Sequence, residues 1–274
     1  MTSPLFILSS GRSGSQMMQK LFSGLDDLEV HHEYLCNIIQ PLGTKYSMNI
    51  INKEDVNDVI NSTYKASINL SNKKIWIDSS NKLTWILDQI IVNFPNAKYV
   101  HIIRDGRRVT SSYFNKLHNE CYDDTSIKIF YDFYRKQSLE NMPPPEKKYW
   151  WPFFKNDGSY DNFFKLSQFE KIVTHWVESN KKIYQDLKSV DKNNVFFIKL
   201  EDLVSKESKF EEFINFCGVD YHSINFDILK KPHNVHVPKS FDLDATQNKQ
   251  FWNISRDIMN DYGYDSKTDY KVNY

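Results

Sequence analysis

From Leu5 to Phe22 the sequence reads LFILSSGRSGSQMMQKLF. Its first four residues are apolar and uninterrupted, which predicts a buried strand. The Ser/Gly run that follows predicts a tight turn. After the turn, apolar residues recur at helical spacing from Met17 to Phe22, which predicts an amphipathic helix. The succession of strand, turn and helix indicates an α/β protein.

The Ser/Gly turn also predicts an anion site. A strand that passes through glycines into a helix N-terminus directs several backbone N–H groups and the positive end of the helix dipole at one point. The turn differs from the triphosphate-binding loop G-x-x-x-x-G-K-[ST], because no lysine follows Gly14. A plain Gly/Ser turn is the alternative. The candidate ligands of a phosphate or sulfate group are Gly11, Arg12, Ser13, Gly14, Ser15 and Gln16.

A second stretch, from Ala97 to Phe114, reads AKYVHIIRDGRRVTSSYF. Its β-branched and aromatic centre predicts a strand that ends at Ile103, followed by a helix. Ligands of open α/β sheets bind beyond the carboxyl ends of the strands, so we expect Arg104 to lie beside the first turn. Ser112 follows it by about two helical turns and could meet the same anion. Together the two stretches predict a ligand with two separated anionic groups.

This combination resembles the sulfotransferases that use 3′-phosphoadenosine 5′-phosphosulfate (PAPS). In that family a [KR]-S-G-[ST] loop after the first strand binds the 5′-phosphosulfate, and an Arg with a Ser eight residues later binds the 3′-phosphate. Arg12 to Ser15 and the pair Arg104 and Ser112 fill both patterns. Three further segments resemble family blocks in the same order. They are WIDSSNK from Trp76, FPNAKY from Phe94 and VFFIKLEDL from Val195.

The resemblance implies a fold and an activity. The fold is a three-layer α/β/α domain over residues 1–274 with a central parallel sheet, similar to P-loop nucleotide hydrolases. The activity is transfer of a sulfuryl group from PAPS to an acceptor hydroxyl, with 3′,5′-adenosine bisphosphate (PAP) as product and no metal. The RSGS and RDGR loops are most similar to the branch with tyrosylprotein sulfotransferases and bacterial relatives. The acceptor could be a carbohydrate, a phenol or tyrosine, or a small metabolite.

The resemblance also implies a catalytic base after the first helix. Sulfuryl transfer needs a group that takes the proton of the acceptor hydroxyl. Glu33 stands at the spacing from Arg12 that this branch uses, and we expect burial to raise its pKa toward working pH. His32 is the competing base, because the usual pKa of a histidine is already near neutral. A solvated loop without a base is the third possibility.

One position departs from the family pattern. Ser79 stands where the family often has a lysine that touches the transferring group. Arg12 and the loop amides would then stabilise the leaving phosphate, with Lys82 as a further candidate, although we favour an exposed lysine at a helix start. Lys116, one helical turn after Ser112, could add charge near the 3′-phosphate or be a plain surface lysine.

Composition restricts the class of protein. The chain has 35 basic and 35 acidic residues, so it offers no broad field for nucleic acid or an anionic membrane. The three cysteines have no CxxC spacing and predict reduced thiols rather than a zinc site or disulfides. No apolar run reaches the length of a membrane span, and Met1 leads almost directly into the first strand. We therefore expect a cytoplasmic enzyme, whose oligomeric state the sequence leaves open.

Strands alternate with helices along most of the chain, which indicates a parallel sheet. The exception is an aromatic-rich insertion at 119–164, which contains three consecutive prolines and a partial helix over about 126–140. It predicts a lid or acceptor-binding region, or else a small hydrophobic cluster. The expected elements are strands 4–9, 73–78, 98–103 and 194–199, and helices 14–24, 53–64, 82–93, 106–118, 165–188, 205–217 and 246–261.

Two other functions fit parts of the pattern. A P-loop kinase or other nucleotide-binding protein that uses Mg-ATP would share the strand, loop and helix, with Asp78 as a metal-binding strand end. A non-catalytic protein could keep the nucleotide fold alone. Near the C-terminus, the segment 231–239 resembles a basic segment that closes over the nucleotide, in which His236 or Lys239 could touch the 3′-phosphate; a plain connector is the alternative.

Overall fold

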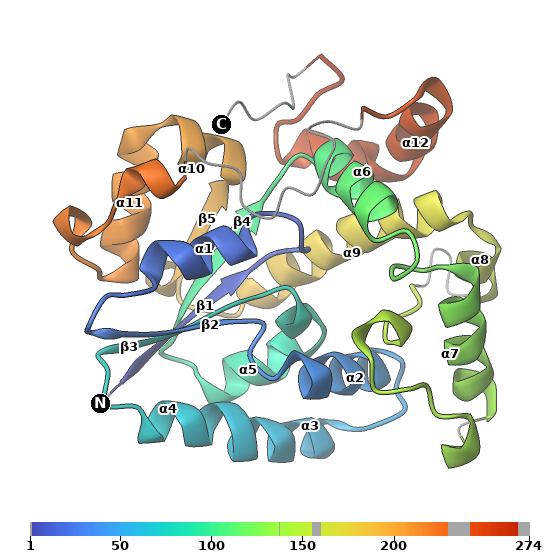
Figure 1. Ribbon diagram of the computed structural model, residues 1–274, viewed down its shortest axis with the longest axis horizontal. Helices are drawn as coiled ribbons and strands as arrows, with labels where there is room; N and C mark the ends of the chain where they lie inside the picture. Colours follow the sequence, from blue (N-terminus) through green and yellow to red (C-terminus); the bar gives the residue numbers. More distant parts are fainter. Residues whose placement is uncertain (1, 137, 155–159, 230–241, 268–274) are drawn as a thin grey trace.

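The centre of the molecule is a parallel sheet. The computed structural model describes residues 2–136, 138–154, 160–229 and 242–267. Five strands lie in the order β2-β3-β1-β4-β5, and each pairs in parallel with its neighbours (Figure 1). The strands are β1 Ser3–Leu8, β2 Leu28–His32, β3 Ile75–Ser80, β4 Lys98–Ile103 and β5 Val195–Lys199.

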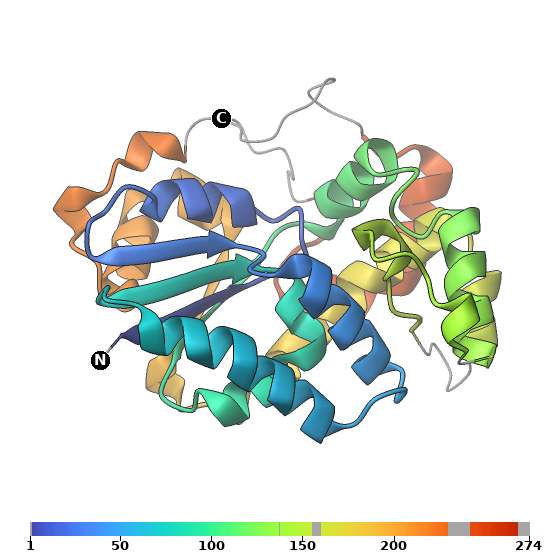
Figure 2. The same cartoon turned by 60° about the horizontal axis from the view of Figure 1, so that its bottom comes forward.

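Helices cover both faces of this sheet (Figures 1 and 2). Successive side chains of a strand point to opposite faces, so Leu5 and Ile7 pack against α1 (Ser15–Phe22), α10 (Leu200–Ser205) and α11 (Glu207–Cys217). Phe6 and Leu8 face the other layer, built by α3 (Lys53–Ile60), α5 (Leu87–Asn93) and the end of α9 (Gln168–Leu187). The expected α/β fold of three layers is confirmed.

Some expected helices have irregular turns. The helix expected at 53–64 consists of α3 and a π-helical turn and continues through α4 to Leu70. The helix expected at 82–93 begins with a 3-10 turn. The remaining elements are α2 Cys36–Ser47, π-helix η1 Asn61–Lys65, α4 Ala66–Leu70, α6 Gly106–Lys116, α7 Asp124–Lys136, α8 Tyr160–Lys165 and α12 Ala245–Asp261, with 3-10 turns η2 Lys82–Ile86, η3 Leu139–Asn141, η4 Lys147–Tyr149, η5 Lys192–Asn194, η6 Tyr221–Ser223 and η7 Phe226–Ile228.

Strand β2 and helix α2 were not expected from the sequence, and neither were the short helices α8 and α10. Strand β2 lies at the edge of the sheet, and only Leu28 of its five residues is buried, so its apolar pattern is weak. Helix α2 follows Leu35, which has a left-handed backbone, and it contains Pro41, which reads as a helix breaker in a sequence. The solvated loop considered for residues 28–33 is therefore an edge strand and a sharp corner.

The insertion forms a second half of the core beside the sheet. It contributes α7, η4 and α8, which lie with α12 and the start of α9 on the right of Figure 1. Trp150, Trp151, Phe153 and Phe163 are all buried in this cluster. Most of the insertion's aromatic side chains thus stabilise the fold. No helix in the described ranges is long and apolar enough to cross a membrane.

Candidate active site

The loop between β1 and α1 has an unusual backbone. Gly11, Arg12 and Gly14 have φ angles of +86°, +53° and +91°, in the left-handed region that favours glycine. A Cβ atom at Gly11 would lie 1.9 Å from Tyr113 Oη, because this hydroxyl packs against the loop and donates to the Ser10 carbonyl at 3.0 Å. The N-cap residue of α1 is Gly14, which has no side chain that could cap the helix. The first N–H groups of the helix therefore lack an intrahelical partner and could bind an anion.

The two predicted anion-binding sequences meet. Arg104 follows β4, the neighbour of β1, and its Nη1 donates to the Arg12 carbonyl at 3.0 Å. The Arg12 Nε donates to Ser112 Oγ at 2.9 Å. Arg104 Nε is buried and has no hydrogen-bond partner among the described residues. Lys116 lies near them, because its pKa is lowered first by partial burial and then by Arg12, Arg104 and Arg108.

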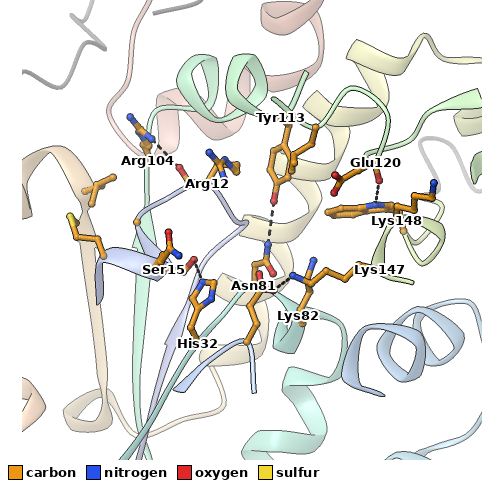
Figure 3. A pocket seen from close by; sticks show the side chains of 17 residues that line it. Arg12, Ser15, His32, Asn81, Lys82, Arg104, Tyr113, Glu120, Lys147 and Lys148 are labelled. Atoms are coloured by element: carbon orange, nitrogen blue, oxygen red, sulfur yellow. Dashed lines mark hydrogen bonds and ion pairs between the residues drawn. The ribbon is translucent and has the colours of Figure 1, made fainter. Parts of the chain in front are cut away.

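A cavity of about 260 Å³ opens at the carboxyl ends of the strands (Figure 3). Of the predicted ligands, Gly11, Ser13, Ser112 and Lys116 do not line it. Ser13 instead donates to the Gly11 carbonyl at 3.0 Å and closes the loop. The lining residues are Arg12, Gly14, Ser15, Gln16, Met17, His32, Glu33, Asn81, Lys82, Arg104, Tyr113, Leu117, Glu120, Lys147, Lys148, Trp151 and Leu200.

Glu33 enters the cavity from the end of β2. Its backbone is left-handed, with φ +52°, and its N–H donates to the Ser79 carbonyl at 3.2 Å. Its carboxylate forms an ion pair with Lys147 of the insertion. Burial alone would raise the pKa of Glu33, but Lys82 and Lys147 outweigh burial and hold the pKa below its usual value. The expected rise of this pKa is wrong, because the expectation considered burial without the charges of Lys82 and Lys147.

His32 connects the base candidate to the anion loop. Its Nε2 shares a hydrogen bond of 3.0 Å with Ser15 Oγ, the first residue of α1. Burial lowers the pKa of His32, and Lys147 and Lys82 lower it further against the opposing effect of Glu33. The imidazole is therefore neutral near pH 7, and it lies where it can position Ser15.

Asp78 stabilises the corner after β2 through hydrogen bonds. It is fully buried and accepts hydrogen bonds from Tyr34 N at 3.1 Å and Tyr64 Oη at 2.9 Å. Burial raises its pKa to about 7, against the hydrogen bonds that lower it. Asp78 does not line the cavity, so its position does not match the metal-binding strand end that a Mg-ATP enzyme would need.

Lys82 differs from the favoured expectation. Only 4 % of its surface is exposed, and its side chain lines the cavity with Nζ 4.5 Å from the centre of the Trp151 ring. Burial lowers its pKa, which Glu33 raises in part. The interpretation of Lys82 as an exposed lysine is thus wrong. The signal that this helix start is buried was the largely apolar segment directly after it, with Leu83, Trp85, Ile86 and Leu87.

The insertion also reaches the cavity, as Figure 3 shows for Lys147 and Lys148. These two lysines and Glu120 were not predicted as site residues. The segment 231–239 and its candidates His236 and Lys239 lie outside the described residues.

A comparison with known proteins finds sulfotransferases among the solved structures. No curated protein sequence matches the chain. A sulfotransferase domain from the curacin biosynthetic pathway is 14% identical with a TM-score of 0.51, and the match covers 97% of this chain and 99% of that one. The sulfotransferase domain of the Synechococcus PCC 7002 olefin synthase is 17% identical (TM-score 0.49; 99% and 92% covered). A sulfotransferase from Alicyclobacillus acidocaldarius is 12% identical (TM-score 0.49; 97% and 97% covered).

The match to a family model is the stronger result. The model described as "Sulfotransferase family" matches residues 4–141, which is half of the 274 residues. This range includes the β1–α1 loop, Glu33, Lys82 and Arg104. The chain therefore belongs to the sulfotransferase family.

Proposed function

We propose that this protein transfers a sulfuryl group from PAPS to a hydroxyl group of an acceptor and releases PAP. The observation that carries the proposal is the contact of Arg104 with Arg12 at 3.0 Å, because it joins two anion-binding segments in one crevice. PAPS has anionic groups at both ends of its ribose. A single nucleotide can therefore occupy both segments.

Each end of the nucleotide has suitable partners. The 5′-phosphosulfate fits the uncapped N-terminus of α1 together with Arg12. The 3′-phosphate fits Arg104, whose buried Nε has no partner among the described residues, and Ser112. Arg108 and Lys116 raise the positive potential there, since both act electrostatically within this group. Guanidinium groups suit this role because they bind phosphates through two parallel hydrogen bonds.

The transfer proceeds in line, in our proposal. Glu33 takes the proton of the acceptor hydroxyl while the hydroxyl oxygen forms a bond to sulfur. The bond between sulfur and the phosphate oxygen of PAPS breaks in the same step. Arg12, the loop N–H groups and Lys82 stabilise the charge that develops on the leaving phosphate. Lys147 must first release the Glu33 carboxylate. The lowered pKa of Glu33 keeps it ionised, so the base is ready at neutral pH.

The test of the function is PAP binding without Mg²⁺. We expect PAP to raise the melting temperature of the protein in EDTA, and Arg104→Gln to weaken PAP binding by about 2–4 kcal/mol, which is roughly 30-fold to 1000-fold. Isothermal calorimetry measures the affinity. Arg135→Gln is the matched control, because Arg135 is exposed on α7 and lies outside the cavity. Stabilisation by Mg-ATP but not by PAP would instead support a kinase.

A further inference from the structure

The cavity carries more positive charge than the proposed nucleotide contacts use. Two acidic side chains, Glu33 and Glu120, line it. Five basic side chains also line it, and three of them (Arg12, Lys82 and Arg104) have a role at the nucleotide in the proposed reaction, so two remain. The five are Arg12, Lys82, Arg104, Lys147 and Lys148.

Two of these cations come from the insertion and lie away from the nucleotide end. Figure 3 shows Lys147 and Lys148 on the side of the cavity opposite Arg104. Both belong to the 3-10 turn η4, directly before the buried Trp150. The Trp150 carbonyl accepts a hydrogen bond from Gln40 Nε2 at 2.6 Å, and Trp150 Nε1 donates to the Pro144 carbonyl at 2.8 Å. The two lysines are thus held by the core.

The insertion offers the cavity little aromatic surface for stacking. Trp151 is the insertion's aromatic residue that lines it, and the Lys82 ammonium lies 4.5 Å from the centre of its ring. Trp151 is 7 % exposed, and its Nε1 is already bound to the Glu120 carbonyl at 2.7 Å. Recognition of an acceptor on this side therefore depends on charge more than on a flat ring.

The ion pair of Glu33 with Lys147 must break before Glu33 can accept a proton. The released ammonium then lies in a cavity that also contains Lys82 and Lys148, and without a new partner these like charges repel. Lys148 makes no ion pair in the part of the chain that the structure describes; its ammonium lies over the Tyr149 ring at 4.9 Å. An anion that arrives with the acceptor would replace Glu33 as the partner of Lys147 and give Lys148 one.

From these contacts we infer that the acceptor carries an anionic group, a carboxylate, phosphate or sulfate, close to the hydroxyl that receives the sulfuryl group. Lys147 and Lys148 bind this anion while Glu33 contacts the hydroxyl. The inference rests on the proposed function, because it takes the other end of the cavity to hold PAPS. It narrows the acceptor from any alcohol or phenol to hydroxyl compounds with a neighbouring negative charge.

The experiment measures acceptor binding to protein saturated with PAP. Matched pairs of probes differ only in the anionic group: 4-hydroxyphenylacetate against 2-(4-hydroxyphenyl)ethanol, and glucose 6-phosphate or glucose 6-sulfate against glucose. Calorimetry or saturation-transfer NMR gives the affinities. We expect the charged member of at least one pair to bind at least 10-fold more tightly than its neutral partner. Comparison of the carboxylate, phosphate and sulfate probes shows which anion is preferred.

Variants assign the preference to the two lysines. The double variant Lys147→Ala with Lys148→Ala should bring the charged probe down to the affinity of the neutral one, and Lys148→Glu should reverse the preference. Lys128→Ala is the control, because it removes an exposed charge from α7 of the same insertion and should change nothing. PAP affinity within about threefold of the parent protein confirms that each variant is folded.

Three results would overturn the inference. They are equal or tighter binding of the neutral probes, no binding of any probe to the PAP complex, and a charge preference that survives in the double variant. In each case intact PAP binding leaves the proposed function standing. A parent protein that fails to bind PAP refutes the proposed function itself, and the inference with it.

Discussion

Lys82 and Glu33 are the two charged side chains whose burial bears most directly on the proposed chemistry. Each shifts the pKa of the other toward its charged form, against the cost of burial. This mutual support stabilises an ammonium beside the proposed site of transfer, close to Ser79, where the family often has a lysine. Lys82 thus provides a positive charge three residues further along the chain than the family pattern indicates.

The Lys82→Met variant tests this role. Methionine keeps an apolar stem against Trp151 and removes the charge, so we expect kcat for sulfuryl transfer to fall by about 10²–10³-fold, as for loss of one transition-state donor. PAP affinity should change by less than fivefold, and the melting temperature should fall only slightly, because Lys147 remains as the ion-pair partner of the buried Glu33 carboxylate. Glu33→Gln should lose turnover in the same way.

A steady-state assay of PAP release from PAPS gives kcat, with the probe that binds most tightly to the PAP complex as acceptor. Unchanged turnover in Lys82→Met would show that this lysine only neutralises Glu33. Turnover of Glu33→Gln equal to the parent would shift the role of base to His32.

At the scale of single residues, the sequence predicts positions that follow from the topology of the sheet, but not positions that depend on how irregular segments pack. Arg104 could be placed beside Arg12, because parallel strands bring their carboxyl ends to one edge whatever the details of packing. Lys147 could not, since the irregular segment around it carries no periodicity that would fix its direction. The pKa of Glu33 was therefore expected to rise, and it falls.

Among the elements, the β1–α1 loop has the strictest steric requirement. Gly11 combines a left-handed backbone with the Tyr113 hydroxyl, which would lie 1.9 Å from an added Cβ. Gly24 has a similar φ of +91° but nothing within 4 Å of an added Cβ. The two glycines therefore separate backbone strain from steric clash.

We expect Gly24→Ala to lower the free energy of unfolding by about 1–2 kcal/mol through backbone strain alone. Gly11→Ala should cost about 1–3 kcal/mol more, because Tyr113 must move, and it should weaken PAP binding at least 10-fold. Urea unfolding and calorimetry measure the two effects. If Gly11→Ala proved no worse than Gly24→Ala in both, the close packing of Tyr113 on the loop would be unimportant.

The elements also show where sequence patterns are informative. Strands β1, β3 and β4 are buried on both faces and contain short apolar runs, such as Ile75 to Ile77 in β3, so they were expected within one or two residues. Strand β2 pairs along only one edge, and its polar residues end beside the cavity, as His32 does. Strand β2, which leads to the base candidates, was missed because most of its side chains are not buried in the core and give no apolar pattern.

On the scale of the whole molecule, buried titratable groups link stability to pH. His101 joins the sheet to α9 through a hydrogen bond of 3.0 Å between its Nε2 and Asn180 Oδ1. Burial lowers its pKa to about 4, and burial lowers the pKa of His175 to about 3. Asp78 acts in the opposite direction, since burial raises its pKa to about 7.

The signs follow from which state binds more protons. Between about pH 6.5 and the lowered values, the unfolded chain protonates both histidines while the folded protein does not, so acid destabilises the fold. Over much of the same range folded Asp78 holds a proton that the unfolded chain has lost, which favours the fold in acid. Two histidines oppose one aspartate, so these three groups together make the free energy of unfolding fall as the pH drops from 7 to 4.

His101→Gln isolates one of these contributions. The glutamine amide can still donate to Asn180 Oδ1 but does not titrate, so the variant should lose about 2–3 kcal/mol less than the parent protein between pH 7 and pH 4. Urea unfolding at half-unit steps of pH gives both curves, and His222→Gln, which changes an exposed histidine of η6, should reproduce the parent. At pH 7 the variant will itself be destabilised if the amide packs poorly, but this offset is the same at every pH and leaves the slope intact. Parallel curves for His101→Gln and the parent would mean that His101 binds its proton equally well in the folded protein and in the unfolded chain, in contradiction to its burial between the sheet and α9.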